Sequence, residues 1–355
     1  MLFQSSPFEV RAAFLYRNVC DFQAELTADR IEGSDRDDIL EGLKYLRQLL
    51  LDIYADTATY RVEDDLESYH RLTQTVLFLY TIGAYGEIVR EGEVSFLRMD
   101  KSLIRKFFKR PAAFHLEALQ NYGFYFEYEK NGRTAETFSS CDALSIYNES
   151  CPSFFQALKH FICRIPVMDS KKDYAMQTDL IMRADFETVL LRGGKRKEDI
   201  NPLRPDILRS LGPQADLWKE LVSNLIIGQG LKASCKFWSY CTPHWIVHLM
   251  RKGKPVCIFT IHTDVLFFEL AAPFEKLEAM AKDKEQLVPS IRKNMEQFGC
   301  IRCGRCGGES ISLVNGISLC IREPWARRFT FEITNTMETK VIAVMISQIH
   351  QEGTA

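Results

Sequence analysis

The stretch HWIVHLMRKGKPVCIFTIH, residues 244–262, decides the fold of the C-terminal half of this chain. Two runs in which apolar and polar residues alternate flank Lys252-Gly253, and alternation with a period of two predicts a pair of β-strands joined by a turn. The run DVLFFEL, residues 264–270, predicts a third strand. The sequence therefore predicts an antiparallel sheet in this region.

The register of this hairpin predicts which side chains share a face. Direct joining of the two runs pairs Leu249 with Val256 and places His248 opposite Cys257. The other face is apolar and comprises Trp245, Val247, Leu249, Val256 and Ile258. His244 and His248 share the more polar face, and with Cys257 they form a candidate second metal site. The alternative is that these are only histidines on the polar side of a hairpin.

Predicted helices and further strands surround this sheet in the sequence. Helices are expected over 215–227, 273–298 and from about 335 onward, with a restart at Pro289 because proline lacks an N–H donor. Strands are expected in SISLV, ISLCI and RFTFEIT, the first two joined by Asn315-Gly316. In the last helix Glu338 is a capping-box partner, and the apolar face comprises Met337, Val341, Val344, Met345 and Ile349. The sequence therefore predicts the α+β class.

The N-terminal half is predicted to be mainly helical. Apolar residues at steps of four and three predict a helix over 37–54 behind an N-cap at Ser34. A second helix over 66–82 is expected to end at Gly83 and Gly86. We therefore expect a helical domain over 1–192, a linker over 193–212 rich in glycine, charge and proline, and an α+β domain over 213–355.

Two short helices from Lys101 and Ala112 precede a predicted hairpin near 124–139, whose turn is Asn131-Gly132. This order is the outline of a winged helix. Basic residues of the first helix are candidate contacts for DNA phosphates, namely Arg105, Lys106, Lys109 and Arg110. The second helix offers base edges only His115, Glu117, Gln120 and Asn121, so a solvated basic helix is the alternative.

Composition limits the partners and the compartment. The chain has 45 basic and 47 acidic residues and a formal charge of -2, which excludes a surface built throughout for nucleic acid or anionic lipid. No apolar run has the roughly 20 residues needed to span a bilayer, and the N-terminus has no signal-peptide pattern. We therefore expect a cytoplasmic protein without a membrane partner, in which the 11 cysteines stay reduced or bind metal.

Four cysteines gather in CIRCGRCGGESISLVNGISLC, residues 300–320. Cys300 and Cys303 form a Cys-x-x-Cys knuckle, and a hairpin at Asn315-Gly316 would place Cys320 opposite Ile311, close to Cys306. The predicted site is a structural zinc held by Cys300, Cys303, Cys306 and Cys320. An iron-sulfur cluster is the alternative, although the expected fourth cysteine before a proline is missing. Free thiols without metal are the other alternative.

The C-terminal third resembles a loose group of uncharacterised bacterial proteins that end in a small α+β domain with a cysteine cluster. The resemblance is carried by GKPVCIFTIH, CIRCGRC, NGISLC and RRFTFEIT and covers residues 230–350. It implies this fold and a metal site, with no activity attached.

No glycine-rich phosphate loop, nucleophile elbow or metalloprotease motif occurs in the sequence. We therefore expect a non-enzymatic binding or regulatory protein with a structural zinc site, whose N-terminal half recognises a small ligand or a protein. The alternative is a winged-helix regulator that binds DNA. A third hypothesis is an enzyme that uses His244, His248 and Glu269.

Overall fold

The structure is a computed structural model of the chain, and it describes residues 7–31, 33, 35–92, 94–107, 112–165, 178–194, 200–239, 242–271, 274–287, 289–298, 311–320 and 328–351. The chain divides into two compact units. The N-terminal unit comprises Met1–Arg196 and Ser239–Pro243, and the C-terminal unit comprises Lys197–Trp238 and His244–Ala355. Both contain helices and antiparallel sheets, which confirms the predicted α+β class.

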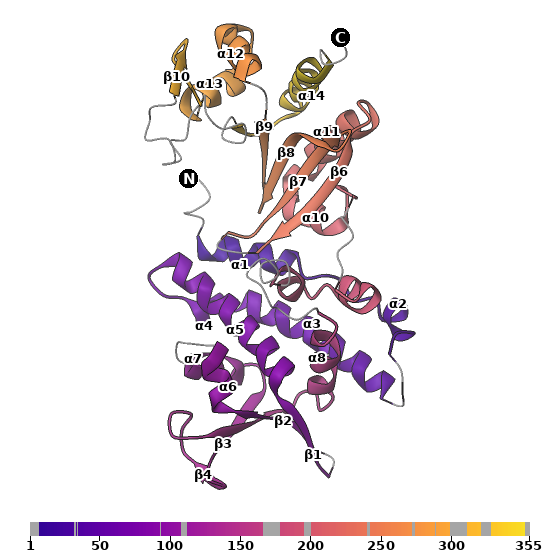
Figure 1. Ribbon diagram of the computed structural model, residues 1–355, viewed down its shortest axis with the longest axis vertical. Helices are drawn as coiled ribbons and strands as arrows, with labels where there is room; N and C mark the ends of the chain where they lie inside the picture. The colour runs from indigo at the N-terminus through magenta and orange to yellow at the C-terminus, as the bar shows by residue number, and fades with distance from the viewer. Residues whose placement is uncertain are drawn as a thin grey trace. The chain divides into compact units, whose positions relative to one another are not determined.

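The N-terminal unit combines helices with a five-stranded sheet (Figure 1). Its described helices include α1 (Phe8–Arg17), α2 (Ala24–Ala28), α3 (Arg36–Ala55), α4 (Thr57–Tyr60), α5 (Asp65–Tyr85), α6 (Lys101–Phe107), α7 (Ala112–Gln120), α8 (Phe154–Ile162) and the π-helical turn η1 (Glu187–Leu191). Its strands are β1 (Glu87–Glu91), β2 (Val94–Asp100), β3 (Phe124–Lys130), β4 (Arg133–Ala135) and β5 (Ala143–Asn148). They lie in the order β1-β2-β5-β3-β4, with every neighbouring pair antiparallel.

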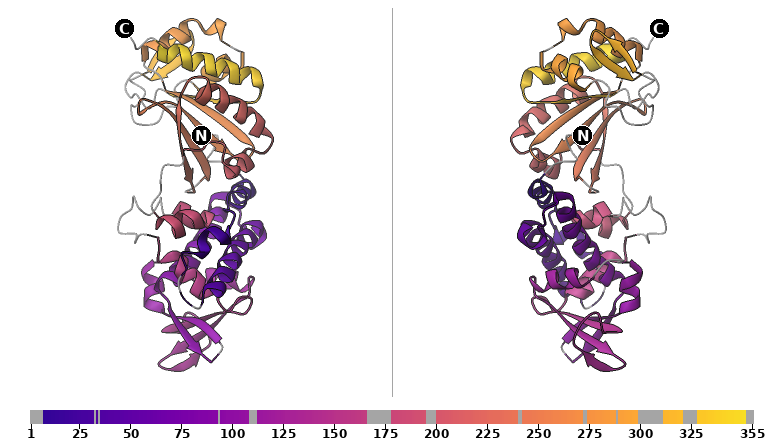
Figure 2. Two further views of the ribbon diagram at one scale, coloured as in Figure 1. Left: turned by 90° about the vertical axis from the view of Figure 1, so that its right-hand side faces the viewer. Right: turned by 90° about the vertical axis from the view of Figure 1, so that its left-hand side faces the viewer.

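One face of this sheet, the inner face, packs against the helices of the unit, which lie on one side of it (Figure 2). Leu97, Leu144 and Ile146 on this face are fully buried. Because side chains alternate along a strand, the residues between them form the opposite, outer face. This layer arrangement gives the unit one packed face and one face available for other contacts.

Close helix packing holds the other side of the unit together. A Cβ atom added at Gly42 of α3 would lie 2.5 Å from Cβ of Ala157 in α8, and one added at Gly83 of α5 would lie 2.6 Å from Cδ2 of Leu158. Both glycines therefore permit the close approach of α8. The prediction that Gly83 ends its helix is wrong, since α5 continues to Tyr85 and its C-cap is Gly86.

The helix predicted over 37–54 is confirmed as α3, which buries Leu43, Leu46, Leu50 and Ile53 on one face. It begins at Arg36 behind Asp35, so Ser34 is not its N-cap. The predicted turn is also confirmed: Lys130 pairs with Arg133, and Asn131 and Gly132 have φ values of 51° and 73°. The hairpin belongs to a five-stranded sheet whose strands β1 and β2 were not predicted, and the winged-helix interpretation stays a prediction.

The C-terminal unit has a second five-stranded antiparallel sheet, in the order β12-β9-β8-β7-β6, and a separate hairpin of β10 and β11. Its helical segments are α10 (Pro205–Leu211), η2 (Gly212–Gln214), α11 (Ala215–Val222), η3 (Ser223–Ile227), α12 (Phe274–Lys282), η4 (Lys284–Gln286), α13 (Pro289–Phe298) and α14 (Thr336–Gln351). Its strands are β6 (Lys232–Trp238), β7 (His244–Arg251), β8 (Lys254–His262), β9 (Val265–Ala271), β10 (Ile311–Val314), β11 (Ile317–Cys320) and β12 (Arg328–Glu332).

Three features of this unit differ from the expectation. Helix α10 buries Ile207 and Leu211, so the second half of the segment predicted as a linker is a packed helix. Strand β6 was not predicted. The predicted apolar face of the last helix is wrong at two positions, because Met337 and Val344 are 64% and 55% exposed.

The predicted restart of a helix at Pro289 is confirmed as the start of α13.

The register predicted for the hairpin over 244–262 is wrong. The turn at Lys252-Gly253 forms as expected and Met250 pairs with Pro255, but a β-bulge then shifts the register, so that Leu249 pairs with Cys257 instead of Val256. Pro255 has no N–H to donate to the ladder, and prolines within sheets concentrate at bulges and edges. The shift places Cys257 on the face of Leu249, where it is fully buried.

The hairpin predicted at Asn315-Gly316 is confirmed in its full register, with Val314 opposite Ile317 and Ile311 opposite Cys320. The predicted capping box of the last helix is confirmed too. Asn335 Oδ1 accepts a hydrogen bond from the Glu338 backbone N–H at 3.1 Å, and Glu338 Oε2 accepts one from the Thr334 N–H at 2.7 Å. Local turn and cap signals therefore suffice for both structures.

Aromatic residue types divide between the units. The 13 tyrosines of the chain all fall within the residues of the N-terminal unit, and the 4 tryptophans all fall within those of the C-terminal unit. Tryptophan fluorescence thus reports on the C-terminal unit. Of the helices that the structure describes, none combines the length and the apolar character needed to cross a membrane.

Candidate functional site

The predicted zinc site falls largely outside the described part of the chain. Cys300, Cys303 and Cys306 lie within 299–310, which the structure does not describe, and Cys320 is described only as the last residue of β11. The β10–β11 register nonetheless places Cys320 opposite Ile311, five positions after Cys306 in the sequence, as expected. The zinc and iron-sulfur hypotheses stay predictions.

The second candidate metal site does not assemble on the sheet. His248 pairs with Ile258, whereas Cys257 pairs with Leu249 and so belongs to the opposite face. His244 and His248 do share a face, but they are four positions apart along the strand, which separates them by about 13 Å. Among the described residues, no group of three or more His, Cys, Asp or Glu side chains is arranged to hold a metal ion.

On the β8 side, His244 neighbours His262, and their ring centroids are 5.0 Å apart. Sequence spacing could not identify this pair, because it depends on the bulged register. Glu269, assigned to the enzyme hypothesis, lies on β9 and accepts a hydrogen bond from Thr260 Oγ1 at 3.0 Å. His248, Ile258 and Glu269 lie in one row on the same face, so strand β8 separates Glu269 from His248, and His244 lies four positions away along β7.

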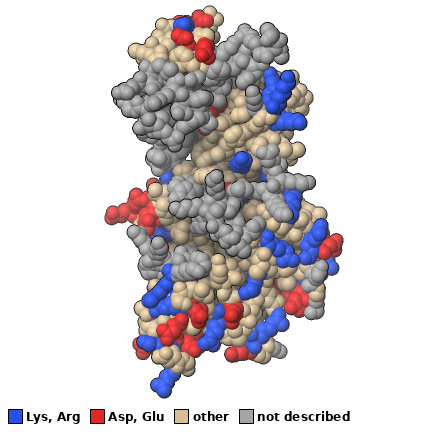
Figure 3. Space-filling view, viewed as in Figure 1, with Lys and Arg blue, Asp and Glu red and all other residues tan. Residues whose placement is uncertain are grey.

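The basic stretch assigned to DNA contact is only partly described. Arg105 is exposed, whereas the Lys106 side chain, Lys109 and Arg110 lie outside the described residues. Lys101 at the start of the same helix is buried, and its Nζ donates to the Cys141 carbonyl at 3.0 Å. On the face of the N-terminal unit seen in Figure 3, basic and acidic side chains are interspersed. DNA binding by this stretch stays a prediction.

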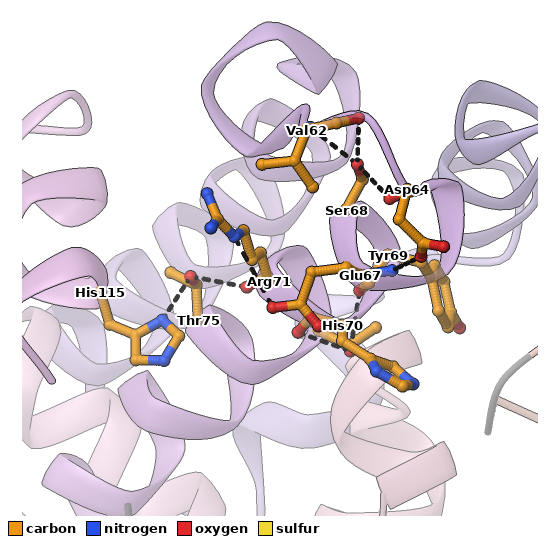
Figure 4. Close-up of polar contacts among 10 residues, drawn as sticks. Val62, Asp64, Glu67, Ser68, Tyr69, His70, Arg71, Thr75 and His115 are labelled. Carbon is orange, nitrogen blue, oxygen red and sulfur yellow. Dashed lines mark hydrogen bonds and ion pairs between the residues drawn. The ribbon is translucent and has the colours of Figure 1, made fainter. Parts of the chain in front are cut away.

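Two of the side chains offered to base edges already have contacts within the unit. Asn121 donates to Thr59 Oγ1 at 3.2 Å. His115 of α7 points toward Thr75 of α5, with Nδ1 2.9 Å from Thr75 Oγ1 (Figure 4). Thr75 donates its one hydroxyl proton to the Arg71 carbonyl, so His115 Nδ1 carries the proton of their shared hydrogen bond.

Burial, followed by the positive charge of Arg71, lowers the pKa of His115 to about 4. The ring is also stacked on Phe78, with centroids 5.6 Å apart. At pH 7 His115 is therefore a neutral residue that is hydrogen-bonded within the unit, rather than a side chain available to contact DNA bases.

The outer face of the N-terminal sheet carries a different set of side chains. Its register places Phe96 of β2, Tyr147 of β5 and Tyr125 of β3 in one row across three adjacent strands. The ring centroids of Tyr125 and Tyr147 are 4.4 Å apart with an interplanar angle of 2°, and those of Phe96 and Tyr147 are 4.7 Å apart. We call these three residues the aromatic column. At the β2 end of the column Phe96 is buried, and at the β3 end Tyr125 is 37% exposed.

Carboxylates surround the aromatic column on the same face. The register and the alternation of side chains place five acidic residues there, namely Glu87, Glu91, Asp100, Glu127 and Glu129. The same face carries one basic residue of these strands, Arg98, which is ion-paired with Glu129 at 2.6 Å. The outer face is therefore both aromatic and acidic.

Burial and the carboxylates of this face raise the pKa values of the two tyrosines in the column. Tyr147 Oη donates to Glu127 Oε2 at 2.9 Å, and burial followed by this hydrogen bond raises the pKa of Tyr147 to about 12. Burial, and then the negative charges of Glu149 and Glu127, raise the pKa of Tyr125. Both hydroxyls thus stay protonated at neutral pH, and the charge of the face comes from its carboxylates.

Sequence reasoning missed this surface. The alternation in FYFEYEK, residues 124–130, could have indicated a strand with one aromatic and acidic face. The partners Phe96 and Tyr147 could not be found in that way, because the order β2-β5-β3 joins strands that are distant in the sequence.

Comparisons with protein-family models, with curated proteins and with solved structures found no match to this chain.

Proposed function

We propose that the chain is a non-enzymatic binding protein that holds a positively charged partner on the outer face of its N-terminal sheet. The observation that carries this proposal is the aromatic column set among five carboxylates. Exposed aromatic rings attract cations through their π-faces, and surrounding carboxylates add long-range attraction. An aromatic row on a sheet also suits stacking with nucleic-acid bases, but the excess of carboxylates would repel phosphates.

The test is binding of labelled octalysine, octaarginine and octaglutamate to the full chain by fluorescence anisotropy at low salt. We expect both cationic peptides to bind, to weaken with added salt, and to bind the double variant Tyr125→Ser/Tyr147→Ser at least tenfold less tightly. Tyr16→Ser is the matched control, because Tyr16 is 46% exposed on α1, away from the sheet. Equal binding of octaglutamate, or no effect of the double variant, would contradict the proposal.

We further propose that Cys300, Cys303, Cys306 and Cys320 hold a structural zinc ion in the C-terminal unit. The cysteine spacing and the β10–β11 register support this proposal. Protein purified without added metal is expected to contain one zinc per chain without visible colour. Cys303→Ser should remove the zinc and lower the tryptophan-detected unfolding midpoint, whereas Cys163→Ser, at an exposed cysteine of the N-terminal unit, should do neither. A brown iron chromophore, or no metal, would overturn the assignment.

A further inference from the structure

Half of strand β3 is an edge of the N-terminal sheet. β3 pairs with β4 only from Tyr128 to Lys130, and of the strands that the structure describes none pairs with 124–127 on that side. An edge of this kind presents backbone N–H and C=O groups to an added strand.

The ladder shows which backbone groups point to this edge. Lys130 belongs to the pair that closes a two-residue turn, and such a pair exchanges both of its hydrogen bonds. Alternate residues therefore direct their backbone groups to the β4 side, and Phe126 and Phe124 follow in that series. The other series points to the β5 side, as shown by the Glu129 carbonyl, which accepts a hydrogen bond from the Asp142 N–H at 2.7 Å. Half-buried Phe126 thus offers the edge one donor and one acceptor, whereas Phe124, at 3% exposed, closes the end of this edge.

Tyr125 lies between these two residues, on the outer face. Tyr147 covers one side of its ring, and the other side adjoins the position that a residue of an added strand would take. Side chains directly opposite one another on neighbouring strands have Cβ atoms about 5 Å apart. The side chain opposite Tyr125 would therefore extend the aromatic column by one more layer.

Charge determines the chemistry of that layer. Glu127 and Glu149 both act electrostatically on Tyr125, and Glu127 is the next residue of β3 on the same face. A planar guanidinium can stack on the tyrosine ring and donate two parallel hydrogen bonds to a carboxylate. A lysine ammonium has no plane to stack and acts only as a point charge. Arginine therefore fits this position better than lysine.

The alternation of side chains extends the pattern to neighbouring positions of the added strand. A second cationic residue two positions away would lie opposite Glu127, and the residue between them would face inward beside half-buried Phe126. The matching segment thus alternates arginine with apolar residues.

We propose that the N-terminal unit binds an extended, arginine-bearing segment of a partner protein as an added strand beside residues 124–127, with one arginine stacked on Tyr125. This inference rests on the proposed function, since it names the partner of the same face.

The test compares three labelled heptapeptides on the full chain: arginine alternating with valine, lysine alternating with valine, and the arginine peptide with N-methylated backbone. We expect the arginine peptide to bind at least tenfold more tightly than the lysine peptide, and N-methylation to abolish binding because it removes the backbone donors. Tyr125→Ala should weaken binding at least tenfold and Tyr125→Phe should preserve it. Tyr85→Ala is the control, at a tyrosine 45% exposed at the end of α5.

The outcomes separate this inference from the proposed function. Equal binding of the arginine and lysine peptides, or unchanged binding after N-methylation, would overturn the added strand and leave a cation-binding face. Loss of binding with Tyr125→Phe would overturn the stacking. If no cationic peptide bound at all, both this inference and the proposed function would fail.

Discussion

The two units build five-stranded antiparallel sheets and use the second faces of those sheets differently. Strand β8 of the C-terminal sheet is buried on both faces, with Phe259 at 0% on one and Ile258 at 4% on the other. Strand β3 of the N-terminal sheet buries Phe124 at 3% and exposes Tyr125 at 37%. Apolar residues on both faces commit a strand to packing on both sides, whereas alternation with aromatic and acidic residues leaves one face for recognition.

The same contrast applies to how the units are held together. In the N-terminal unit, glycines let helices approach until a single added methyl group would clash. In the C-terminal unit, a capped helix and local hairpins follow well-marked signals in the sequence. Three substitutions test this contrast, and each is read by far-UV circular dichroism for the whole chain and by tryptophan fluorescence for the C-terminal unit alone.

The largest effect is expected from Gly42→Ala. The new Cβ would lie 2.5 Å from Cβ of Ala157 and 3.0 Å from the Ser153 carbonyl oxygen, neither of which can rotate away. Overpacking of this kind should lower the free energy of unfolding of the N-terminal unit by about 3 kcal/mol, less a gain of ~1 kcal/mol from the helix propensity of alanine. The tryptophan-detected transition should not move. Lys44→Ala, at an exposed position of α3, is the control, and an unchanged urea midpoint for Gly42→Ala would show that α8 packs less closely.

An effect of similar size is expected from acid. The pKa of His115 is about 4 in the folded unit and near its ordinary value of 6.5 when unfolded, so the unfolded state binds more protons between these values. The stability that this residue contributes is therefore present above pH 6.5 and is lost as the pH falls toward 4, by about 3 kcal/mol. The pKa of His160 is also lowered to about 4, by burial and then by Arg164, and acts in the same direction.

His115→Gln isolates the first histidine, because glutamine can still donate a hydrogen bond to Thr75 and does not titrate. We expect this variant to lose less stability than the native chain between pH 7 and pH 4, as measured by urea titrations at each pH. Identical pH profiles for the two proteins would refute the assignment of a buried, neutral His115.

The smallest effect is expected at a helix cap. Asn335→Ala removes the acceptor that the Glu338 N–H uses at the start of α14, which should lower the stability of the C-terminal unit by about 1 kcal/mol. Ser153→Ala is the counterpart in the N-terminal unit, where the Ser153 side chain makes no capping hydrogen bond to α8. We expect no measurable loss there, and equal losses in the two units would remove this part of the contrast.

Two hairpins show how far the sequence predicts this fold. The Asn315-Gly316 hairpin has its predicted register because nothing interrupts the four pairs that follow the turn. The Lys252-Gly253 hairpin also turns where expected, but the bulge beside Pro255 moves Cys257 to the other face. A signal at the turn fixes only the nearest pairs, and an inserted residue reverses every side chain beyond it.

The candidate site shows a second limit. Alternation within residues 124–130 is local and readable, but the column formed by Phe96, Tyr147 and Tyr125 depends on β5 inserting between β2 and β3. Local periodicity carries no information on strand order, so the sequence indicates each strand and not the surface that three of them form together.

The short segment Ser239–Pro243 affects how the two units could be exchanged between genes by recombination. It connects β6 to β7 of the C-terminal sheet yet belongs to the N-terminal unit, where Ser239 accepts a hydrogen bond from Tyr69 Oη and donates one to Asp179 Oδ1. A recombination event with its breakpoint near residue 196 would deliver a gene for the N-terminal unit without these five residues. The two units are thus interleaved along the gene, and a single crossover would separate this segment from the rest of its unit.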